Sequence, residues 1–295
     1  MPPPAAPPPA ARLRRLRQYV QLKRLAAPWI DATNRLVNHD GLEIAGSMAF
    51  SAVLTLFPFL IFLFAIAAFF HVEGAARDAV TFVFGPLPEQ IKGALTTPLT
   101  EALSFRSPDL LTFSVILALW SSSNGVESLR TGLNRAYQAR ETRHIVRRRL
   151  EALAAVIIGT GIALLIAYLT VASAVIWSDA RAALPKIAQE AADAVTGAIV
   201  THYLIAGGVL FFSLSLAHLL LPGGSRRLSH IIPGVTVTTV AFLAMTAGFS
   251  AYLANFGNYA VIYGGLGGIA AAMVFFYFTA IVILFGAELN RALRA

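Results

Sequence analysis

Residues 231–287 decide the fold class of this chain. They read IIPGVTVTTVAFLAMTAGFSAYLANFGNYAVIYGGLGGIAAAMVFFYFTAIVILFGA and contain no Asp, Glu, Lys, Arg or His. A helix of about 20 apolar residues crosses a bilayer, so this stretch is too long for one crossing. It fits two helices, at about 231–254 and 265–288, joined by a turn where Asn, Gly and Tyr concentrate. The sequence therefore predicts an all-α membrane protein.

The composition of the whole chain agrees with this prediction. Of 295 residues, 57% are hydrophobic and only 13% are charged, about half the charged share of an average soluble domain. The mean hydropathy is +0.69. Soluble enzymes and nucleic-acid-binding proteins of ordinary type are therefore disfavoured. The chain has no cysteine, which excludes disulfides, thiolate nucleophiles and zinc-thiolate sites.

Four further apolar stretches precede residue 231, so six membrane spans are expected in a transmembrane domain over 44–295. The first, third and fourth have few or no charges, whereas the second carries polar residues into its C-terminal half. The six predicted spans lie at about 44–72, 108–134, 152–177, 195–221, 231–254 and 265–288.

The N-terminal region divides into two segments. Residues 1–11 form a Pro/Ala tract that predicts a disordered tail. Residues 12–43 are basic and weakly amphipathic, typical of a juxtamembrane segment that lies on an anionic membrane surface; a solvated helix before the first span fits the pattern equally well. On the first interpretation, anionic lipid headgroups would bind Arg12, Arg14, Arg15, Arg17, Lys23 and Arg24.

The distribution of basic residues predicts the orientation. With six spans, 18 of the 23 Lys and Arg residues fall on the side that holds both termini. The positive-inside rule then places both termini in the cytoplasm. The net charge of +8 is therefore explained by the orientation of the protein in a plasma membrane, and we expect no nucleic-acid partner.

The second span is unusual because polar residues recur along it. Ser121, Asn124, Ser128, Thr131 and Arg135 are spaced three or four residues apart and would form one helical stripe. Polar groups at membrane depth usually face a protein interior or a water-filled cavity. The stripe and the adjacent Trp120 predict a substrate path, although the same residues would also suit a helix that leaves the bilayer soon after Trp120.

Further polar residues of the first two spans extend this candidate path. Glu127 and Arg130 are three apart and can pair on one helical turn, and Asn134 lies beside the stripe. In the first span, Ser51 and Thr55 lead to Pro58, a candidate hinge. Their hydroxyl groups suit helix packing and, as the alternative, a cavity wall.

Other candidates have simpler interpretations. His202 and His218 lie in the fourth span, where a proton relay is one interpretation and hydrogen-bonded structural histidines are the other. Gly264 and Gly268 have the small-residue spacing of packed helix pairs. Glu288 is expected to pair with an arginine at the cytoplasmic interface. No histidine spacing fits a metal site, and no motif indicates a cofactor.

Several short motifs together resemble the YihY/BrkB family of bacterial inner-membrane proteins, a family once labelled ribonuclease BN. The resemblance implies six helices, a plasma-membrane location, a transporter or exporter role and, separately, an association with virulence. The ribonuclease label does not fit, since the sequence has neither an acidic metal cluster nor paired histidines. The motifs are Leu56-Phe57-Pro58, Leu133-Asn134-Arg135-Ala136-Tyr137, Pro233-Gly234, Phe249-Ser250-Ala251-Tyr252, Tyr263-Gly264 and Gly286-Ala287-Glu288.

Two functions follow from these observations. The first is a transporter of an anionic or amphiphilic small molecule, including lipid-like ones, that works without ATP hydrolysis because no Walker motif occurs. The second is a membrane scaffold in cell-envelope assembly. We do not expect an enzyme. For the oligomeric state, both a monomer and a homo-oligomer fit the sequence. A polar cavity at membrane depth would favour transport, and tight packing there would favour the scaffold.

Overall fold

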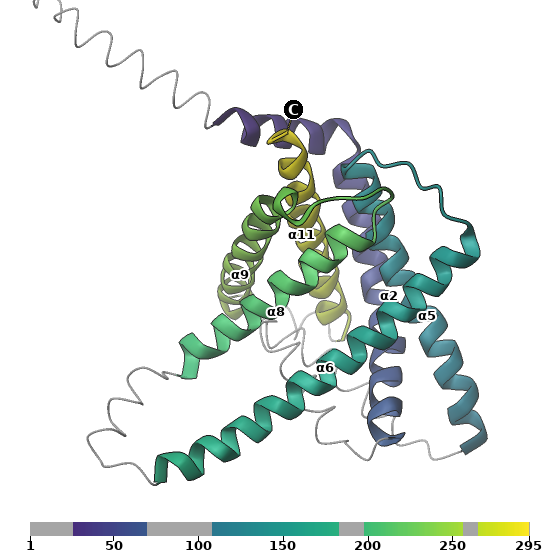
Figure 1. Ribbon diagram of the computed structural model, residues 1–295, viewed down its shortest axis with the longest axis vertical. Coiled ribbons are helices and arrows are strands. Elements are labelled where there is room, and N and C mark those ends of the chain that lie inside the picture. Colours follow the sequence, from purple (N-terminus) through teal and green to yellow (C-terminus); the bar gives the residue numbers. More distant parts are fainter. Residues whose placement is uncertain (1–25, 70–107, 183–197, 256–264, 295) are drawn as a thin grey trace, which may run out of the picture.

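The computed structural model describes residues 26–69, 108–182, 198–255 and 265–294, and these are helical apart from short turns and loops (Figure 1). The fold class is therefore confirmed for the described residues. The long helices are α2 (Gly41–Phe69), α5 (Pro108–Ala136), α6 (Ile145–Ala182), α8 (Ala198–Leu220), α9 (Ile232–Asn255) and α11 (Gly265–Ala292), with a 3-10 turn, η1 (Leu228–His230).

Each predicted span coincides largely with one of these helices. Within the described residues, three helical segments are long and apolar enough to cross a membrane: Gly41–Leu63, Ile232–Leu253 and Gly267–Ala292. A shorter apolar segment, Gly207–Leu220, lies in α8. The count of six spans and the cytoplasmic position of both termini stay predictions.

Helix α11 lies at the centre of the bundle and packs against α2, α9 and α5. Two apolar clusters form its contacts. Phe275 packs with Leu60 and Leu63 of α2, while Leu284 packs with Leu133 of α5. All of these side chains are almost fully buried. Because α11 contacts both the first and the penultimate long helix, it joins the two ends of the chain into one body.

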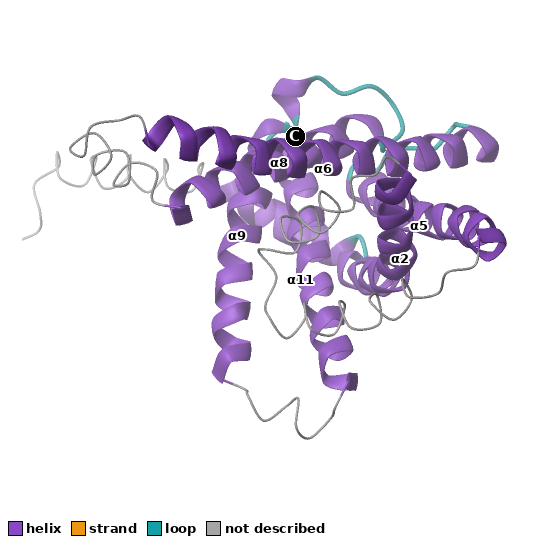
Figure 2. Ribbon diagram, turned by 90° about the horizontal axis from the view of Figure 1, so that it is seen from below, coloured by secondary structure: helices purple, strands orange, loops and turns teal. Residues whose placement is uncertain are grey.

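Glycines set the closest helix contacts. A Cβ added at Gly125 of α5 would lie 2.8 Å from Thr55 Oγ1 of α2, and one added at Gly132 would overlap the sulfur of Met48. In the antiparallel pair of α9 and α11 (Figure 2), Gly234 and Gly286 face each other so closely that a Cβ on either meets backbone or Thr238. Small residues thus let backbones approach, as is common between membrane helices.

Hydroxyl groups inside the apolar helices bond to their own helix. Thr55 Oγ1 donates to the Ser51 carbonyl at 2.7 Å, and Ser122 Oγ donates to the Ala118 carbonyl at 2.6 Å. Such bonds to the preceding turn satisfy a polar side chain without an external partner. Pro58 lies inside α2, which continues through it to Phe69.

A helix at 26–38 precedes α2 and lies across the end of α11 that carries the C-terminus (Figure 1). Trp29 contacts Phe285, with ring centroids 6.0 Å apart. The chain then turns at Asp40, which has a positive φ of 58°, a conformation that Asp tolerates better than most residues. The basic residues from Arg12 to Arg24 lie outside the described part of the chain.

Helices α6 and α8 are attached to different partners. α6 packs on α5, and α8 packs on α9. The two do not pack along each other within the described residues. This divergence leaves space between them, and that space becomes the candidate site.

Candidate functional site

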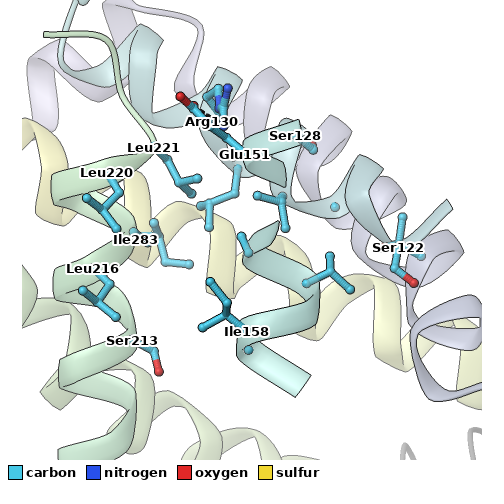
Figure 3. A pocket seen from close by; sticks show the side chains of 18 of the residues that line it. Ser122, Ser128, Arg130, Glu151, Ile158, Ser213, Leu216, Leu220, Leu221 and Ile283 are labelled. Carbon is cyan, nitrogen blue, oxygen red and sulfur yellow. Dashed lines mark ion pairs between the residues drawn. The ribbon is translucent and has the colours of Figure 1, made fainter. Parts of the chain in front are cut away.

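A cavity of about 1330 Å³ lies between α5, α6 and α8, with α2 and α11 at its back (Figure 3). It exceeds the range of about 300–1,000 Å³ typical of pockets for drug-sized ligands. Most of its wall is apolar, including Ile158 of α6, Leu216 of α8 and Ile283 of α11. Hydroxyl groups of Thr55 and Ser122 interrupt this wall. The shape and chemistry suit a large, mostly apolar ligand.

Charged side chains are confined to one part of the lining. They are Arg130 of α5, Arg143 of the following loop, and Arg147 and Glu151 of α6. Arg130 is only 1% exposed. Its Nη2 lies 3.2 Å from Glu151 Oε2, and its Nε lies 3.6 Å from Glu127 Oε2. None of its guanidinium nitrogens makes a hydrogen bond within the described residues.

Glu151 is shared among three cations. Its Oε2 accepts a hydrogen bond from Arg143 Nη1 at 2.6 Å and also lies near Arg130, while its Oε1 accepts from Arg147 Nε at 3.1 Å. α6 begins with an arginine run and has no acidic residue in its first turn. The helix dipole disfavours cations at that end, and Glu151, together with Glu127 bound to Arg148, offsets this cost.

The loop between α5 and α6 is tied to the end of α8. Arg143 donates to the Leu221 carbonyl at 2.6 Å and to Glu141 Oε1 at 2.9 Å. Asn134 bridges the same parts, since its Nδ2 donates to Glu141 at 3.1 Å and its Oδ1 accepts from the Gly223 amide at 2.7 Å. This bonding holds the charged part of the cavity lining between α6 and α8.

The same contacts shift two pKa values. Burial alone would raise the pKa of Glu141, but its hydrogen bonds from Arg143 and Asn134 outweigh burial and lower the pKa below its ordinary value. Burial alone would lower the pKa of Arg143, but Glu141 and Glu151 outweigh it and raise the pKa. Both groups are therefore held in their charged forms.

A second polar cluster connects α8, α9 and α11 next to this loop. Tyr137 Oη lies 2.7 Å from His218 Nδ1 and accepts from Asn290 Nδ2 at 3.1 Å. Asn290 Oδ1 in turn accepts from the Gly234 amide at 2.7 Å. Arg226 lies over the Tyr137 ring, 4.2 Å from its centroid. His218 is fully buried in this cluster and does not line the cavity.

A third cluster joins the N-terminal helix to α11. Glu288 is 1% exposed, and its Oε1 lies 2.7 Å from His39 Nδ1. The other nitrogen of His39 lies 2.8 Å from Gln138 Nε2, and Arg291 donates to Gln138 Oε1. We expected an arginine as the direct partner of Glu288; the structure pairs it with His39, because the helix at 26–38 brings that side chain across the end of α11.

Among the predicted path and stripe residues, Thr55, Ser128 and Arg130 line the cavity. The remaining eight, within the described residues, do not: Ser51, Trp120, Ser121, Asn124, Glu127, Thr131, Asn134 and Arg135. The helix phase explains this difference. The cavity-facing positions of α5 include Ser122, Gly125 and Ser128, which lie on a neighbouring face to most of the predicted stripe.

The residues of the stripe have other partners. Arg149 of α6 donates to Asn124 Oδ1 at 2.7 Å and lies 3.8 Å from the centroid of the Trp120 ring. Thr131 donates to the Glu127 carbonyl. The predicted pairing of Glu127 with Arg130 is present at 3.6 Å.

Two predicted residues cannot be placed. Gly264 and the side chain of His202 lie outside the described residues, whereas Gly268 is described in the first turns of α11. The described residues include no group of three or more His, Asp or Glu side chains that could hold a metal ion.

Sequence reasoning missed Glu151 and Arg143 as site residues. The available signal was the acidic residue at position 151, which lies two positions after an arginine run and precedes a charge-free span. A carboxylate in that setting must have a cationic partner. The spacing alone did not show that one of its partners would be Arg130, 21 positions earlier.

The long apolar helices indicate a helical membrane protein, and comparison with known proteins identifies its family. The chain belongs to the family described as Virulence factor BrkB, which matches residues 32–295. The family expected from the sequence motifs is thereby confirmed.

Individual relatives cover most of this chain. A ribonuclease-like protein of Bacillus subtilis, YfkH, is 28% identical over 88% of this chain and 93% of its own length. A UPF0761 membrane protein of Pseudoalteromonas atlantica is 28% identical over 90% and 88% of the two chains. Another, from Rhodospirillum centenum, is 29% identical over 89% of this chain but only 56% of its own length. No solved structure matches this chain.

Proposed function

We propose that this protein is a transporter in the bacterial inner membrane that moves an amphiphilic anion through the cavity between α6 and α8, without ATP hydrolysis. The proposal includes six membrane spans and two cytoplasmic termini. The single observation that carries it is a cavity of about 1330 Å³ whose wall is apolar except for hydroxyl groups and one charged region.

The charged region gives the ligand its expected sign. Three arginines and one glutamate line it, namely Arg130, Arg143, Arg147 and Glu151. A molecule whose apolar part lies along Ile158 and Leu216 would place its polar end beside these arginines. Guanidinium groups bind carboxylates and phosphates through paired hydrogen bonds. An acidic headgroup on an apolar body therefore suits both parts of the lining.

The two candidate functions make different demands on this cavity. A scaffold needs large apolar interfaces and no internal space. Within the described residues, α6 and α8 do not pack on each other, so they bury less surface than two packed helices would. A scaffold gains nothing from this loss of buried surface. A transporter requires such a space. The wall is mostly apolar and not the polar wall expected from the stripe, so the support for transport comes from the space itself and from its charged region.

Blocking the cavity tests this proposal. The chain has no cysteine, so a single one can be introduced without a background. Ser213→Cys places a thiol on the cavity wall, and Thr236→Cys places one on α9, away from the cavity. Both variants are labelled fully with a bulky maleimide in detergent, checked by mass, and reconstituted into liposomes.

The readout is transfer of a fluorescent phosphatidylglycerol between leaflets, followed by dithionite quenching. Labelled Ser213→Cys should lose most of the protein-dependent transfer, whereas labelled Thr236→Cys should match its unlabelled form. Equal transfer by both labelled proteins, or no transfer above empty liposomes by the unlabelled ones, would exclude this cavity as a lipid path.

A further inference from the structure

We infer that Arg130 is the headgroup-binding residue for an anionic phospholipid, and that Glu151 occupies the headgroup's place when the lipid is absent. This inference rests on the proposed function and names its substrate class. Arg130 and Glu151 face each other at the cavity wall (Figure 3). Glu151 is thus an internal competitor of the ligand rather than only a structural partner.

The bonding of Arg130 is incomplete. It is 1% exposed, yet no nitrogen of its guanidinium makes a hydrogen bond within the described residues. Its two carboxylate contacts, at 3.2 and 3.6 Å, are longer than the usual 2.7–2.9 Å of charge-assisted bonds. A buried cation in this state gains from any acidic group that can reach it. The cavity is the route by which such a group arrives.

Glu151 can release Arg130 without losing its own partners. It keeps a 2.6 Å contact with Arg143 and a 3.1 Å contact with Arg147 when the 3.2 Å contact with Arg130 is broken. The lining then offers more positive than negative groups, since three arginines face one carboxylate. When the phosphodiester of a lipid replaces the Glu151 carboxylate beside Arg130, one negative charge replaces another, so the charge next to Arg130 does not change.

The surroundings favour a lipid over a free anion. Beyond the arginines the wall is built mostly by apolar side chains of five helices, such as Ile158, Leu216 and Ile283. A free phosphate would leave this surface in contact with water, whereas acyl chains would cover it. The occupant is therefore an anionic lipid whose phosphate reaches Arg130.

The headgroup site is connected to the cavity's frame. Arg143, which shares Glu151 with Arg130, also donates to the carbonyl oxygens of Leu220 and Leu221 at the end of α8. Movement of Glu151 toward Arg143 would compete with these carbonyl bonds. Binding of a phosphate at Arg130 would therefore weaken the hydrogen bonds that hold the end of α8 to the loop between α5 and α6.

Binding measurements on two variants test the inference. Purified full-length protein in a non-ionic detergent is titrated with dipalmitoyl phosphatidylglycerol, with phosphatidylcholine and with inorganic phosphate, and bound lipid is counted by native mass spectrometry. Arg130→Gln should weaken phosphatidylglycerol binding by about tenfold or more. Glu151→Gln should strengthen it by about threefold or more, because the competitor is neutralised.

The opposite directions separate competition from structure. Both substitutions break the same ion pair, so a purely structural role would weaken binding in both. Arg149→Gln is the matched control, since this arginine of α6 contacts Trp120 and Asn124 and does not line the cavity. It should leave phosphatidylglycerol binding within twofold of the wild type. Elution volume and helical content of each variant report whether it is folded.

Three results would overturn the inference. They are weaker or unchanged binding in Glu151→Gln, equal affinity for phosphatidylcholine, and saturable binding of inorganic phosphate that matches the lipid. Because these measurements need no flux, their failure is distinct from failure of transport. Leaflet transfer without the predicted binding pattern would keep the transporter and reject this headgroup site, and the reverse result would keep the site and reject transport.

Discussion

The contact between α9 and α11 gives the sharpest prediction about stability. Gly286 of α11 faces α9 so closely that an added Cβ would overlap Thr238 Oγ1 and lie 2.8 Å from the Gly234 carbonyl oxygen. Neither obstacle can move freely, because Thr238 Oγ1 donates to the Val282 carbonyl at 3.2 Å and the Gly234 amide is held by Asn290. Gly286→Ala must therefore push the two helices apart.

The magnitude follows from two opposing terms. Alanine gains about 1 kcal/mol over glycine in a helix interior, and overpacking of a close contact costs about 1–3 kcal/mol. With backbone as one obstacle, the cost lies at the upper end, so a net loss of about 2 kcal/mol is expected. Gly248→Ala on α9 is the matched control, because nothing lies within 4 Å of its added Cβ; it should gain up to about 1 kcal/mol.

Thermal unfolding in a non-ionic detergent, followed by far-UV circular dichroism, measures both variants. Gly286→Ala should melt below the wild type and Gly248→Ala at or above it. Adding Thr238→Ala to Gly286→Ala should recover part of the loss, since it removes one of the two obstacles. A Gly286→Ala protein as stable as the wild type would refute this account of the helix contact.

Two further substitutions probe the polar clusters. Glu141→Gln should make the stability of the protein less sensitive to acid. The pKa of Glu141 is lowered in the folded protein by hydrogen bonds from Arg143 and Asn134. The ionised carboxylate therefore stabilises the fold above its ordinary pKa of 4.5, and this stabilisation is lost as the pH falls through the lower folded-state value. Melting temperatures from pH 7 to 3 should fall less steeply in the variant than in the wild type. Tyr137→Phe leaves buried His218 without its hydroxyl partner and should cost about 1–3 kcal/mol; chemical denaturation in detergent measures this loss, and an unchanged midpoint would show that the bond contributes nothing.

The positions of the helices could be predicted from hydropathy because each apolar stretch must form its own backbone hydrogen bonds in a membrane. The charge-free stretch 231–287 accordingly forms α9 and α11. Local spacing also predicted contacts within one helix, as for Glu127 and Arg130. Both predictions depend on residues close together in the chain.

Contacts between distant segments could not be predicted in this way. Glu288 pairs with His39, 249 positions away, because the N-terminal helix crosses the end of α11. Gly125 and Gly132 allow α2 to pack closely against α5, and this packing determines which side of α5 faces the cavity. A rotation of one residue about the helix axis therefore separates Ser122, which lines the cavity, from the predicted Ser121.

Protein-dependent movement of lipid between leaflets tests the central proposal most directly. Wild-type protein is reconstituted at increasing protein-to-lipid ratios, and transfer of fluorescent phosphatidylglycerol is compared with that of fluorescent phosphatidylcholine. The cavity with Arg130 predicts transfer that rises with the amount of protein and is faster for the anionic lipid. Transfer of the anionic lipid at the rate of empty liposomes, in protein shown to be folded, would contradict the proposed function.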